Sequence, residues 1–254
     1  MVIKDRQRLS LSPNSVKLAF RVGVHNPKAL GDYILLGKGV STQGQTNGLA
    51  LAIGWDILGL SSYWRQIKAN TTLKDHIEAK LSGVNYGQVA IPELLYVLVR
   101  KLCPKTVVET GVAAGVSSAY ILQALGDNEY GGLYSIDYPN YAMGEGHPIP
   151  KGMETGFAVP DYLRGRWELQ IGKSQGLLSL LLERLDKVDM FLHDSEHSYQ
   201  NMLHEYKVAW QYVNSGGLLI SHDINETSAF REFTQIVKCK GHEIYFTGMG
   251  VIRK

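Results

Sequence analysis

From about Asn85 onward, short apolar runs alternate with stretches that have the periodicity of helices. Runs such as TVVE at 106–109 and VDMFLH at 188–193 are too short for helices and are apolar or β-branched enough for buried strands. Strands that alternate with helices fold as a parallel sheet with helices on both faces. The sequence therefore predicts an α/β chain with a doubly wound, mostly parallel sheet.

The alternation predicts seven strands, the last two forming an antiparallel hairpin around Thr247-Gly248. Gly216 and Gly217 are expected to turn the helix over 198–213 into the last parallel strand, because glycine commonly ends helices. The expected strands are residues 106–109, 133–137, 168–171, 188–193, 218–221, 243–246 and 249–252. The expected helices are residues 92–101, 117–125, 175–185, 198–213 and 226–238.

Residues 1–84 lack this alternation and carry scattered glycine, serine and asparagine, as in GVSTQGQTNG at 39–48. We expect residues 1–84 to be an N-terminal extension, serving as an oligomerisation arm or as an arm that covers the substrate. The α/β domain is expected over residues 85–254. A length of 254 residues suits one large domain with such an extension.

Composition excludes several classes of function. Lys and Arg number 26 against 24 Asp and Glu, and the resulting formal net charge of +2 argues against a nucleic-acid partner. The first residues are charged where a signal peptide is apolar, and no apolar run reaches the ~20 residues of a membrane helix. Cys103 and Cys239 are too few for a disulfide framework. We expect a cytoplasmic protein with no membrane partner.

Ligands bind to doubly wound sheets at the carboxyl ends of the strands. In this chain those ends are followed by polar or glycine-rich residues in all five parallel strands. The strand ends in question are Glu109, Asp137, Ile171, His193 and Ser221. The functional residues are therefore expected along this edge of the sheet.

The sequence Glu109-Thr-Gly111-Val-Ala-Ala-Gly115-Val-Ser117 lies between the first strand and its helix. Its glycines permit a tight turn and the close approach of a ligand, and the helix start offers free N–H groups. The phosphate-binding spacing G-x-G-x-x-G is absent, and the carboxylate of Glu109 favours a cationic or hydroxyl-rich ligand instead. The alternative interpretation is a glycine turn that serves packing alone.

Asp137 ends the second expected strand. An acidic residue in this place can accept hydrogen bonds from the diol of a ribose. An aspartate at a strand end is also a common turn residue, so both interpretations stay open at this point.

These two segments together resemble the class I S-adenosylmethionine-dependent methyltransferases, which carry E/D-x-G-x-x-x-G and an acidic residue closing the second strand. Gly172-Lys173-Ser174-Gln175 resembles the G-x-S-Q turn of catechol O-methyltransferase-like enzymes. The strings HDSEHSY and GGLLISHD are similar to a branch with metal-dependent macrolide sugar O-methyltransferases and cephalosporin-cluster enzymes. The resemblance covers about residues 85–254 and implies a Rossmann-like fold that binds S-adenosylmethionine.

The resemblance implies a role for each matching residue. The methionine part of the cofactor would be held, and the cofactor lined, by Glu109, Gly111, Gly115 and Ser117. The ribose would be bound by Asp137, the adenine would be bordered by Ser174 and Gln175, and Asp194 would also lie beside the cofactor.

Asp194 and Asp223 follow the fourth and fifth strands, where this group of enzymes carries metal ligands. Two carboxylates favour a hard cation, Mg²⁺ first, with Mn²⁺ or Ca²⁺ as alternatives. The catechol enzymes have an asparagine where this chain has Ile224, so the third ligand stays open among Glu145, Asp161, His222 and Asn225. His197 stands in place of their lysine and would take the proton of the acceptor as the catalytic base.

The segment 193–197 also matches H-x-x-E-H, a zinc-peptidase signature, through His193, Glu196 and His197. Zinc binding by this motif needs a helix that places both histidines on one face. The preceding apolar run predicts a strand instead, which argues against the motif. A third interpretation is that these histidines only cap or solvate the strand end.

A long loop rich in proline and glycine is expected over residues 138–160, and loops of this length usually have a function. Aromatic residues gather in this loop and just after it, and they either form a lid over the cofactor and acceptor or anchor the loop in the core. These residues are Tyr138, Tyr141, Phe157, Tyr162 and Trp167.

The expected function is that of an S-adenosylmethionine-dependent O-methyltransferase assisted by Mg²⁺ and acting on a hydroxyl of a small molecule or a natural-product sugar. The alternatives are a non-catalytic S-adenosylmethionine-binding protein, with the N-terminal extension as a partner module, and a zinc peptidase. A small-molecule acceptor is the expected partner, and a homo-oligomer is left open.

Overall fold

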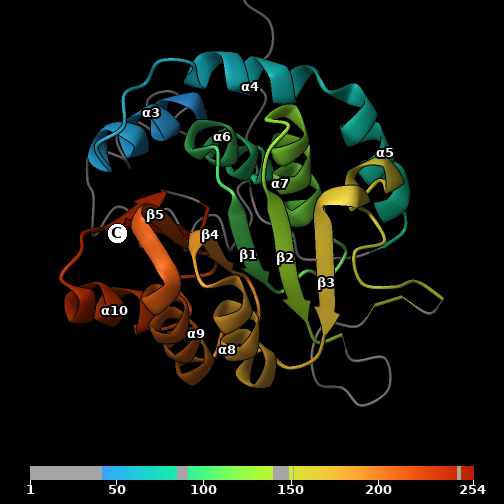
Figure 1. Ribbon diagram of the computed structural model, residues 1–254. Helices are drawn as coiled ribbons and strands as arrows, with labels where there is room; N and C mark the ends of the chain where they lie inside the picture. Colours follow the sequence, from blue (N-terminus) through green and yellow to red (C-terminus); the bar gives the residue numbers. More distant parts are fainter. Residues whose placement is uncertain (1–41, 85–90, 140–148, 151, 245–246) are drawn as a thin grey trace, which may run out of the picture. The chain divides into compact units, whose positions relative to one another are not determined.

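The computed structural model describes residues 42–84, 91–139, 149–150, 152–244 and 247–254. The unit Thr42–Lys254 contains a seven-stranded sheet of order β3-β2-β1-β4-β5-β7-β6 (Figure 1). Strands β1 to β5 run parallel, and β7 pairs antiparallel with both β5 and β6. The strands are β1 (Thr106–Thr110), β2 (Gly132–Asp137), β3 (Trp167–Ile171), β4 (Val188–His193), β5 (Val213–Ser221), β6 (Gly241–Ile244) and β7 (Met249–Arg253). The predicted doubly wound, mostly parallel sheet with a C-terminal antiparallel hairpin is confirmed.

Helices cover both faces of the sheet. The first face packs against α6 (Pro92–Leu102) and α7 (Val116–Asp127), and the second against α8 (Ser174–Leu185), α9 (Tyr199–Tyr212) and α10 (Ala229–Val237). Val107 and Leu192 belong to the first core cluster, whereas their neighbours Val108 and Phe191 belong to the second. Successive residues of a strand point to opposite faces, so both cores are filled from the same strands.

Helix α6 begins and ends at the signals that its sequence carries. Pro92 occupies the first turn, where a missing backbone N–H has no cost. Cys103 takes a left-handed conformation with φ 50° after the last turn, and Pro104 follows it. The helix thus ends shortly before β1 begins at Thr106.

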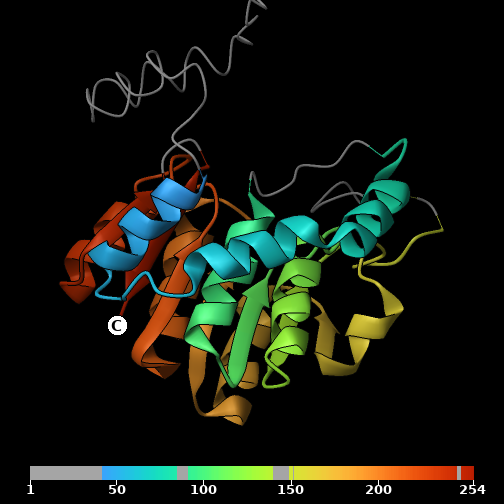
Figure 2. The ribbon, with the colours of Figure 1, turned by 90° about the horizontal axis from the view of Figure 1, so that it is seen from above.

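The described part of the N-terminal extension is helical, with α3 (Thr42–Ala52), α4 (Leu60–Ala69) and α5 (Thr71–Leu81). Leu60, Trp64 and Ile67 of α4 are buried and belong to the same core cluster as α6 and α7. Figure 2 shows α4 running across the outer side of these helices. Within Thr42–Lys254, the extension therefore shares the core of the α/β domain. No helix among the described residues has both the length and the apolar character needed to cross a membrane.

The turn predicted at Gly216 and Gly217 is wrong. Helix α9 passes into β5 at Val213, which pairs with Val188 of β4. The register then shifts before Met190, and Gly216 has φ 84° within the strand. The glycines therefore accommodate an irregularity inside a longer strand, as glycine does at β-bulges.

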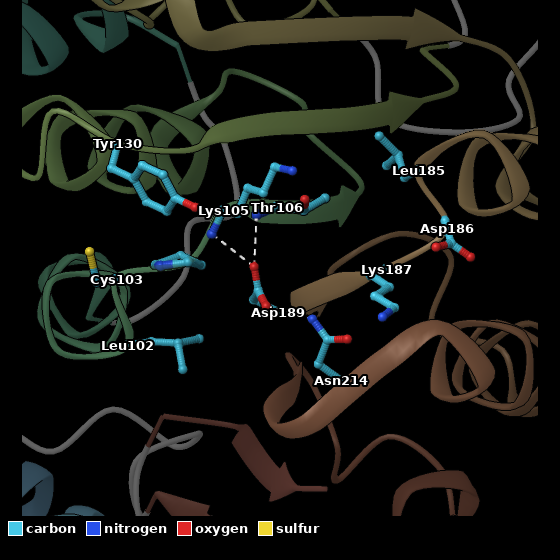
Figure 3. Close-up of a pocket in the computed structure, with 11 residues that line it drawn as sticks. Leu102, Cys103, Lys105, Thr106, Tyr130, Leu185, Asp186, Lys187, Asp189 and Asn214 are labelled. Atoms are coloured by element: carbon cyan, nitrogen blue, oxygen red, sulfur yellow. Dashed lines mark hydrogen bonds between the residues drawn. The ribbon is translucent and has the colours of Figure 1, made fainter.

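A cavity of about 440 Å³ lies at the amino ends of β1 and β4 (Figure 3). Asp189 accepts hydrogen bonds from the backbone N–H groups of Lys105 at 2.8 Å and Thr106 at 3.0 Å. It also accepts one from Nδ2 of Asn214 at 2.7 Å. These bonds join the first residues of three strands, so Asp189 has a structural role at the edge opposite to the one where such sheets bind ligands.

Candidate active site

The carboxyl ends of the central strands bring the predicted site residues together. Thr110 of β1 is in register with His193 of β4, which is in register with Ser221 of β5. Asp194 and His222 each lie one residue beyond these strand ends. The sheet register alone therefore makes Asp194 and His222 neighbours.

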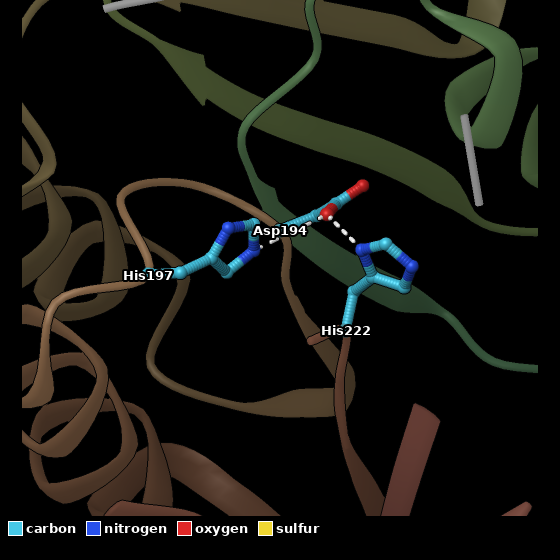
Figure 4. A group of neighbouring side chains, drawn as sticks. All are labelled: Asp194, His197 and His222. Atoms are coloured by element: carbon cyan, nitrogen blue, oxygen red, sulfur yellow. Dashed lines mark ion pairs between the residues drawn. The ribbon is translucent and has the colours of Figure 1, made fainter. Parts of the chain in front are cut away.

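Two carboxylates and two imidazoles form a polar cluster at this edge, made of Asp194, His197, His222 and Asp223. Figure 4 shows the first three of these side chains. Nδ1 of His222 lies 2.9 Å from Oδ1 of Asp194 and 3.5 Å from Oδ2 of Asp223. Nε2 of His197 lies 3.6 Å from Oδ1 of Asp194, and its Nδ1 lies 3.7 Å from Oδ2 of Asp223. Each imidazole thus approaches both carboxylates.

Charge within the polar cluster favours an ionised Asp194. Burial of this carboxyl opposes its charge, but the imidazoles of His197 and His222 outweigh burial and lower the pKa of Asp194. Burial of His222 likewise opposes its charged form, but the hydrogen bond to Asp194 outweighs it and raises the pKa of His222.

His222 is the candidate third ligand that lies inside the polar cluster. Asp161 instead pairs with Arg164 in the short 3₁₀ helix η1 (Asp161–Arg166), with Oδ1 3.3 Å from Nε, and Asn225 is exposed. Glu145 lies outside the described residues. Donor atoms of Asp194, His197 and His222 all lie within 4.8 Å of one another, which is compact enough to surround one cation. Imidazole and carboxylate together form a donor set that divalent metals accept.

The arrangement of His193 and His197 does not meet the requirement of the zinc-peptidase motif. His193 is the last residue of β4, and His197 precedes α9, so the two do not share a helix face. The ring of His193 is fully buried, and its Nδ1 lies 2.6 Å from Oε2 of Glu205. Its partner is therefore a carboxylate of α9, and its ring also packs edge-on against that of His197, with centroids 5.5 Å apart.

Glu109 is fully buried on the face covered by α7. Its Oε2 accepts hydrogen bonds from the hydroxyls of Ser118 at 2.6 Å and Ser135 at 2.9 Å. Its Oε1 has no hydrogen-bond partner among the described residues. Burial raises the pKa of Glu109 to about 8, although the two hydroxyls oppose the rise. An unpaired buried oxygen is a favourable place for a ligand that donates a hydrogen bond.

The glycine turn after β1 is shaped by packing against the chain around it. Gly111 has φ 86°, and a Cβ on it would lie 2.0 Å from the carbonyl oxygen of Asp194. Gly115 has φ 89°, and a Cβ on it would lie 2.7 Å from Cγ2 of Val159. No described side chain caps the first turn of α7 after Gly115, so its N–H groups stay available to a ligand. The glycines thus serve packing, and the helix start provides a binding surface.

Asp137 connects the second strand to the glycine turn. Its Oδ1 accepts a hydrogen bond from the backbone N–H of Val112 at 3.1 Å, and its Oδ2 accepts one from the hydroxyl of Thr155 at 3.2 Å. Asp137 therefore ties the end of β2 to the glycine turn and to Thr155.

The two residues predicted to border the adenine make polar contacts with α9. Nε2 of Gln175 donates to Oδ1 of Asn201 at 2.7 Å, and Ser174 hydrogen-bonds Glu205. Ser117 is buried in the first turn of α7. Ser174 and Gln175 therefore connect the start of α8 to α9, a structural role that their motif alone does not indicate.

Glu205 is a fully buried carboxylate that sequence reasoning missed. It accepts hydrogen bonds from the hydroxyl of Thr110, from Oγ of Ser195 at 2.7 Å and from Nδ2 of Asn201 at 3.1 Å, in addition to its contact with His193. Burial would raise the pKa of Glu205, but the His193 ring and the hydroxyl donors hold it well below its usual range. The only signal in the sequence is an acidic residue within an otherwise amphipathic helix, which is too common to be informative.

The aromatic residues around the long loop divide into two groups. Phe157 and Trp167 pack against the core, and Nε1 of Trp167 donates to Oγ of Ser135 at 2.9 Å. Tyr138 and Tyr162 are exposed. Tyr141 lies outside the described residues. Anchoring therefore accounts for two of the five. Of the exposed pair, the Tyr138 ring lies 5.0 Å from Nζ of Lys173, and the hydroxyl of Tyr162 donates to Oε1 of Gln123 on α7 at 3.4 Å.

We expect Gly111→Ala to destabilise the fold and to abolish cofactor binding, because the new methyl group would overlap the Asp194 carbonyl and strain a left-handed residue. Thermal unfolding and calorimetric titration with S-adenosylhomocysteine measure the two effects. Gly126→Ala in α7 is the matched control, since a Cβ there meets no atom within 4 Å. A Gly111→Ala protein that folds and binds like the parent would contradict the close contact.

Comparison with known proteins agrees with this geometry. Residues 108–224 match the family model described as a methyltransferase domain. No curated protein matches the sequence.

Solved structures resemble the chain in fold. The SAH-bound methyltransferase PaMTH1 of Podospora anserina has a TM-score of 0.53 and 14% identity, covering 71% of this chain and 86% of that chain. An O-methyltransferase of Bacillus cereus in complex with SAH has a TM-score of 0.51 and 13% identity, with coverage of 73% and 91%. The O-methyltransferase TomG of Streptomyces achromogenes, in complex with SAM, has a TM-score of 0.51 and 14% identity, with coverage of 71% and 88%.

The family match spans the strand ends that carry Glu109, Asp137, Asp194 and Asp223, and the sheet has the order and directions expected of the fold. The prediction of the fold is confirmed. Residues 108–224 match a methyltransferase domain, in agreement with the predicted family.

Proposed function

We propose that the protein transfers the methyl group of S-adenosylmethionine to a hydroxyl oxygen of a small molecule. The observation that carries this proposal is the contact between the glycine turn and the polar cluster. Gly111 lies against the backbone of Asp194, so the turn expected to hold the cofactor adjoins the two carboxylates and two imidazoles. A sulfonium methyl is already activated, whereas a neutral hydroxyl is a weak nucleophile and needs a base.

The residues around the glycine turn fit the methionine end of the cofactor. Glu109 would bind the ammonium group, because its buried Oε1 lacks a donor among the described residues. The uncapped start of α7 would bind the carboxylate, as helix N-termini do. Asp137, at the end of β2 beside the glycine turn, would accept hydrogen bonds from the ribose hydroxyls.

His197 is the proposed catalytic base. Its two ring nitrogens approach different carboxylates, Asp194 and Asp223, which orient the ring. An imidazole is well suited to accept a hydroxyl proton near neutral pH. Holding the acceptor oxygen in line with the sulfur–methyl bond would supply much of the remaining rate enhancement.

The polar cluster also fits a divalent cation. Asp194 and His222, whose donor atoms lie within 4.8 Å of each other, would supply an oxygen and a nitrogen ligand. Asp223, whose Oδ2 lies 3.5 Å from Nδ1 of His222, would supply a second oxygen and leave His197 as the base. Such a mixed set suits Mn²⁺ or Zn²⁺ as well as the Mg²⁺ expected from the carboxylates alone. A bound cation would lower the pKa of the acceptor hydroxyl.

A small hydroxylated acceptor, including the sugar part of a natural product, fits the properties of the chain. The formal net charge of +2 gives no broad basic surface for nucleic acid. Tyr138 directly follows the end of β2 and is exposed, and an exposed tyrosine offers both apolar surface and a hydroxyl to such a ligand. Methyl transfer to a panel of phenols, catechols and glycosides, followed by mass spectrometry, tests the proposal directly.

Binding of S-adenosylhomocysteine should release close to one proton at pH 7. With its pKa raised to about 8, the Glu109 carboxyl of the free protein is mostly neutral at pH 7, and an ammonium ligand would favour the ionised form. Affinity should therefore increase as pH rises toward about 8. Calorimetry in two buffers of different ionisation enthalpy counts the protons.

Glu109→Gln should weaken this binding by about 1–3 kcal/mol and remove its pH dependence. Glu243→Gln, at an exposed position of β6, should keep both properties of the parent. Binding that stays independent of pH in the parent would contradict the role of Glu109.

His197→Ala should lower kcat by about 10²–10⁴-fold while cofactor affinity is retained, because a general base contributes about that factor. The loss should become smaller as pH rises and the acceptor ionises without help. His76→Ala, on α5, is the control for removing a histidine. An active His197→Ala enzyme at neutral pH would exclude His197 as the base.

EDTA should abolish methyl transfer and leave the binding of S-adenosylhomocysteine largely intact. Adding a divalent cation in excess should restore the activity. Asp223→Asn should have the same effect as EDTA, since it removes one charged ligand. Asp161→Asn, at an exposed site, serves as the control. Full activity in EDTA would eliminate the metal from the proposal.

A further inference from the structure

Glu205 places a charge where proteins rarely tolerate one. The residue lies within α9 and is fully buried beneath the carboxyl ends of β1 and β4. Burying a carboxylate costs several kcal/mol unless hydrogen bonds compensate. A residue kept at such a cost needs an explanation beyond filling space, because a leucine would fill the same space with less cost.

Every donor around Glu205 comes from a segment that borders the active site. Oε2 is contacted by Thr110 at the end of β1 and by His193 at the end of β4. Oε1 is contacted by Ser195, in the loop after β4, and by Asn201, in the first turns of α9. Ser174, the first residue of α8, also hydrogen-bonds this carboxylate. We call Glu205 and these five partners the Glu205 network.

The Glu205 network holds the segment 193–197 from one side only. His193 and Ser195 flank Asp194 in sequence, and both contact the same carboxylate. Nδ2 of Asn201 adds hydrogen bonds to Oγ of Ser195 at 3.1 Å and to the carbonyl oxygen of Glu196 at 3.0 Å. The residues on either side of Asp194 are therefore fixed toward α9.

Fixing these neighbours leaves Asp194 pointing away from α9. Alternation along an extended chain sends Asp194 to the face opposite to that of His193 and Ser195, where it meets His222 at 2.9 Å. His197 follows immediately and lies near the same carboxylate. Hydrogen bonds to α9 thus restrain the segment that carries Asp194 and His197, and the His193 ring also packs edge-on against His197.

We propose that Glu205 is a positioning residue that acts on methyl transfer through His197 by holding the segment 193–197. The effect of Glu205 on methyl transfer rests on the proposed function of His197. The restraint that Glu205 places on residues 193–197 does not depend on that function. Glu205→Gln keeps the size of the side chain but replaces one carboxylate oxygen by an amide N–H₂ group. Because the groups around that oxygen are hydrogen-bond donors, the amide N–H₂ cannot accept their hydrogen bonds. The substitution should loosen the segment without removing its residues.

The first part of the experiment measures the restraint without turnover. Hydrogen–deuterium exchange of the full-length protein should show faster exchange in peptides covering 193–198 in Glu205→Gln, with exchange in the other β-strands unchanged. Ser195→Ala, which removes one bond to Glu205, should reproduce a smaller change at the same place. Glu243→Gln is the matched control. Parent-like exchange at 193–198 in Glu205→Gln would overturn the proposal.

The second part uses a double-mutant cycle on kcat. Glu205→Gln alone should lower kcat by about 10²-fold, the effect of displacing a reacting group by about 1 Å, with little change in the affinity for S-adenosylhomocysteine. In a His197→Ala background, Glu205→Gln should lower kcat almost no further, because both substitutions act through the imidazole of His197. Additive losses would overturn the link to His197 and leave Glu205 a purely structural residue.

The two parts separate the failure of this inference from that of the proposed function. A parent protein that methylates no acceptor would contradict the proposed function, and the exchange experiment would still decide whether Glu205 restrains the segment. An active parent with an additive cycle would contradict the inference alone.

Discussion

The alternation of side chains at the ends of the parallel strands is the constraint on which the active site depends. Glu109 and Asp194 point to the face of α6 and α7, and Thr110 and His193 point to the face of α9. Because the side-chain period of a strand is two, a slip of one residue would exchange the two sets. The same register therefore places Glu109 and Asp194 on one face and the groups that contact Glu205 on the other.

The fold and the edge of the sheet that carries the site could be predicted from the sequence, because both follow from local pattern. VDMFLH forms a strand over the predicted residues, and the polar residues after β4 and β5 do converge. Gly216 misled the prediction because a glycine in a bulge and a glycine in a turn look the same in a sequence. The difference depends on pairing with β4, which is a tertiary property.

The composition of the site was harder to predict than its place. Asp194 and Asp223 were expected as metal ligands from their places after the strands, but the sequence did not indicate that the imidazoles of His197 and His222 contact both carboxylates. Glu205 was missed because its partners come from three other segments, and no motif records contacts between segments. Sequence pattern finds residues that follow strands, whereas burial and hydrogen bonding depend on what the fold places beside them.

The backbone of Asp223 is in the left-handed region, with φ 49°, which aspartate and asparagine adopt at lower cost than other residues with a Cβ. The turn of the C-terminal hairpin adjoins it, since a Cβ on Gly248 would lie 3.2 Å from Oδ1 of Asp223, and the N–H of Ile224 bonds the carbonyl of Gly248 at 3.0 Å. Chain geometry thus restricts which side chains this position accepts, independently of chemistry. Alanine there would alter charge and backbone strain together, whereas asparagine isolates the charge. The hairpin, distant in the sequence, is in this way part of the wall of the active site.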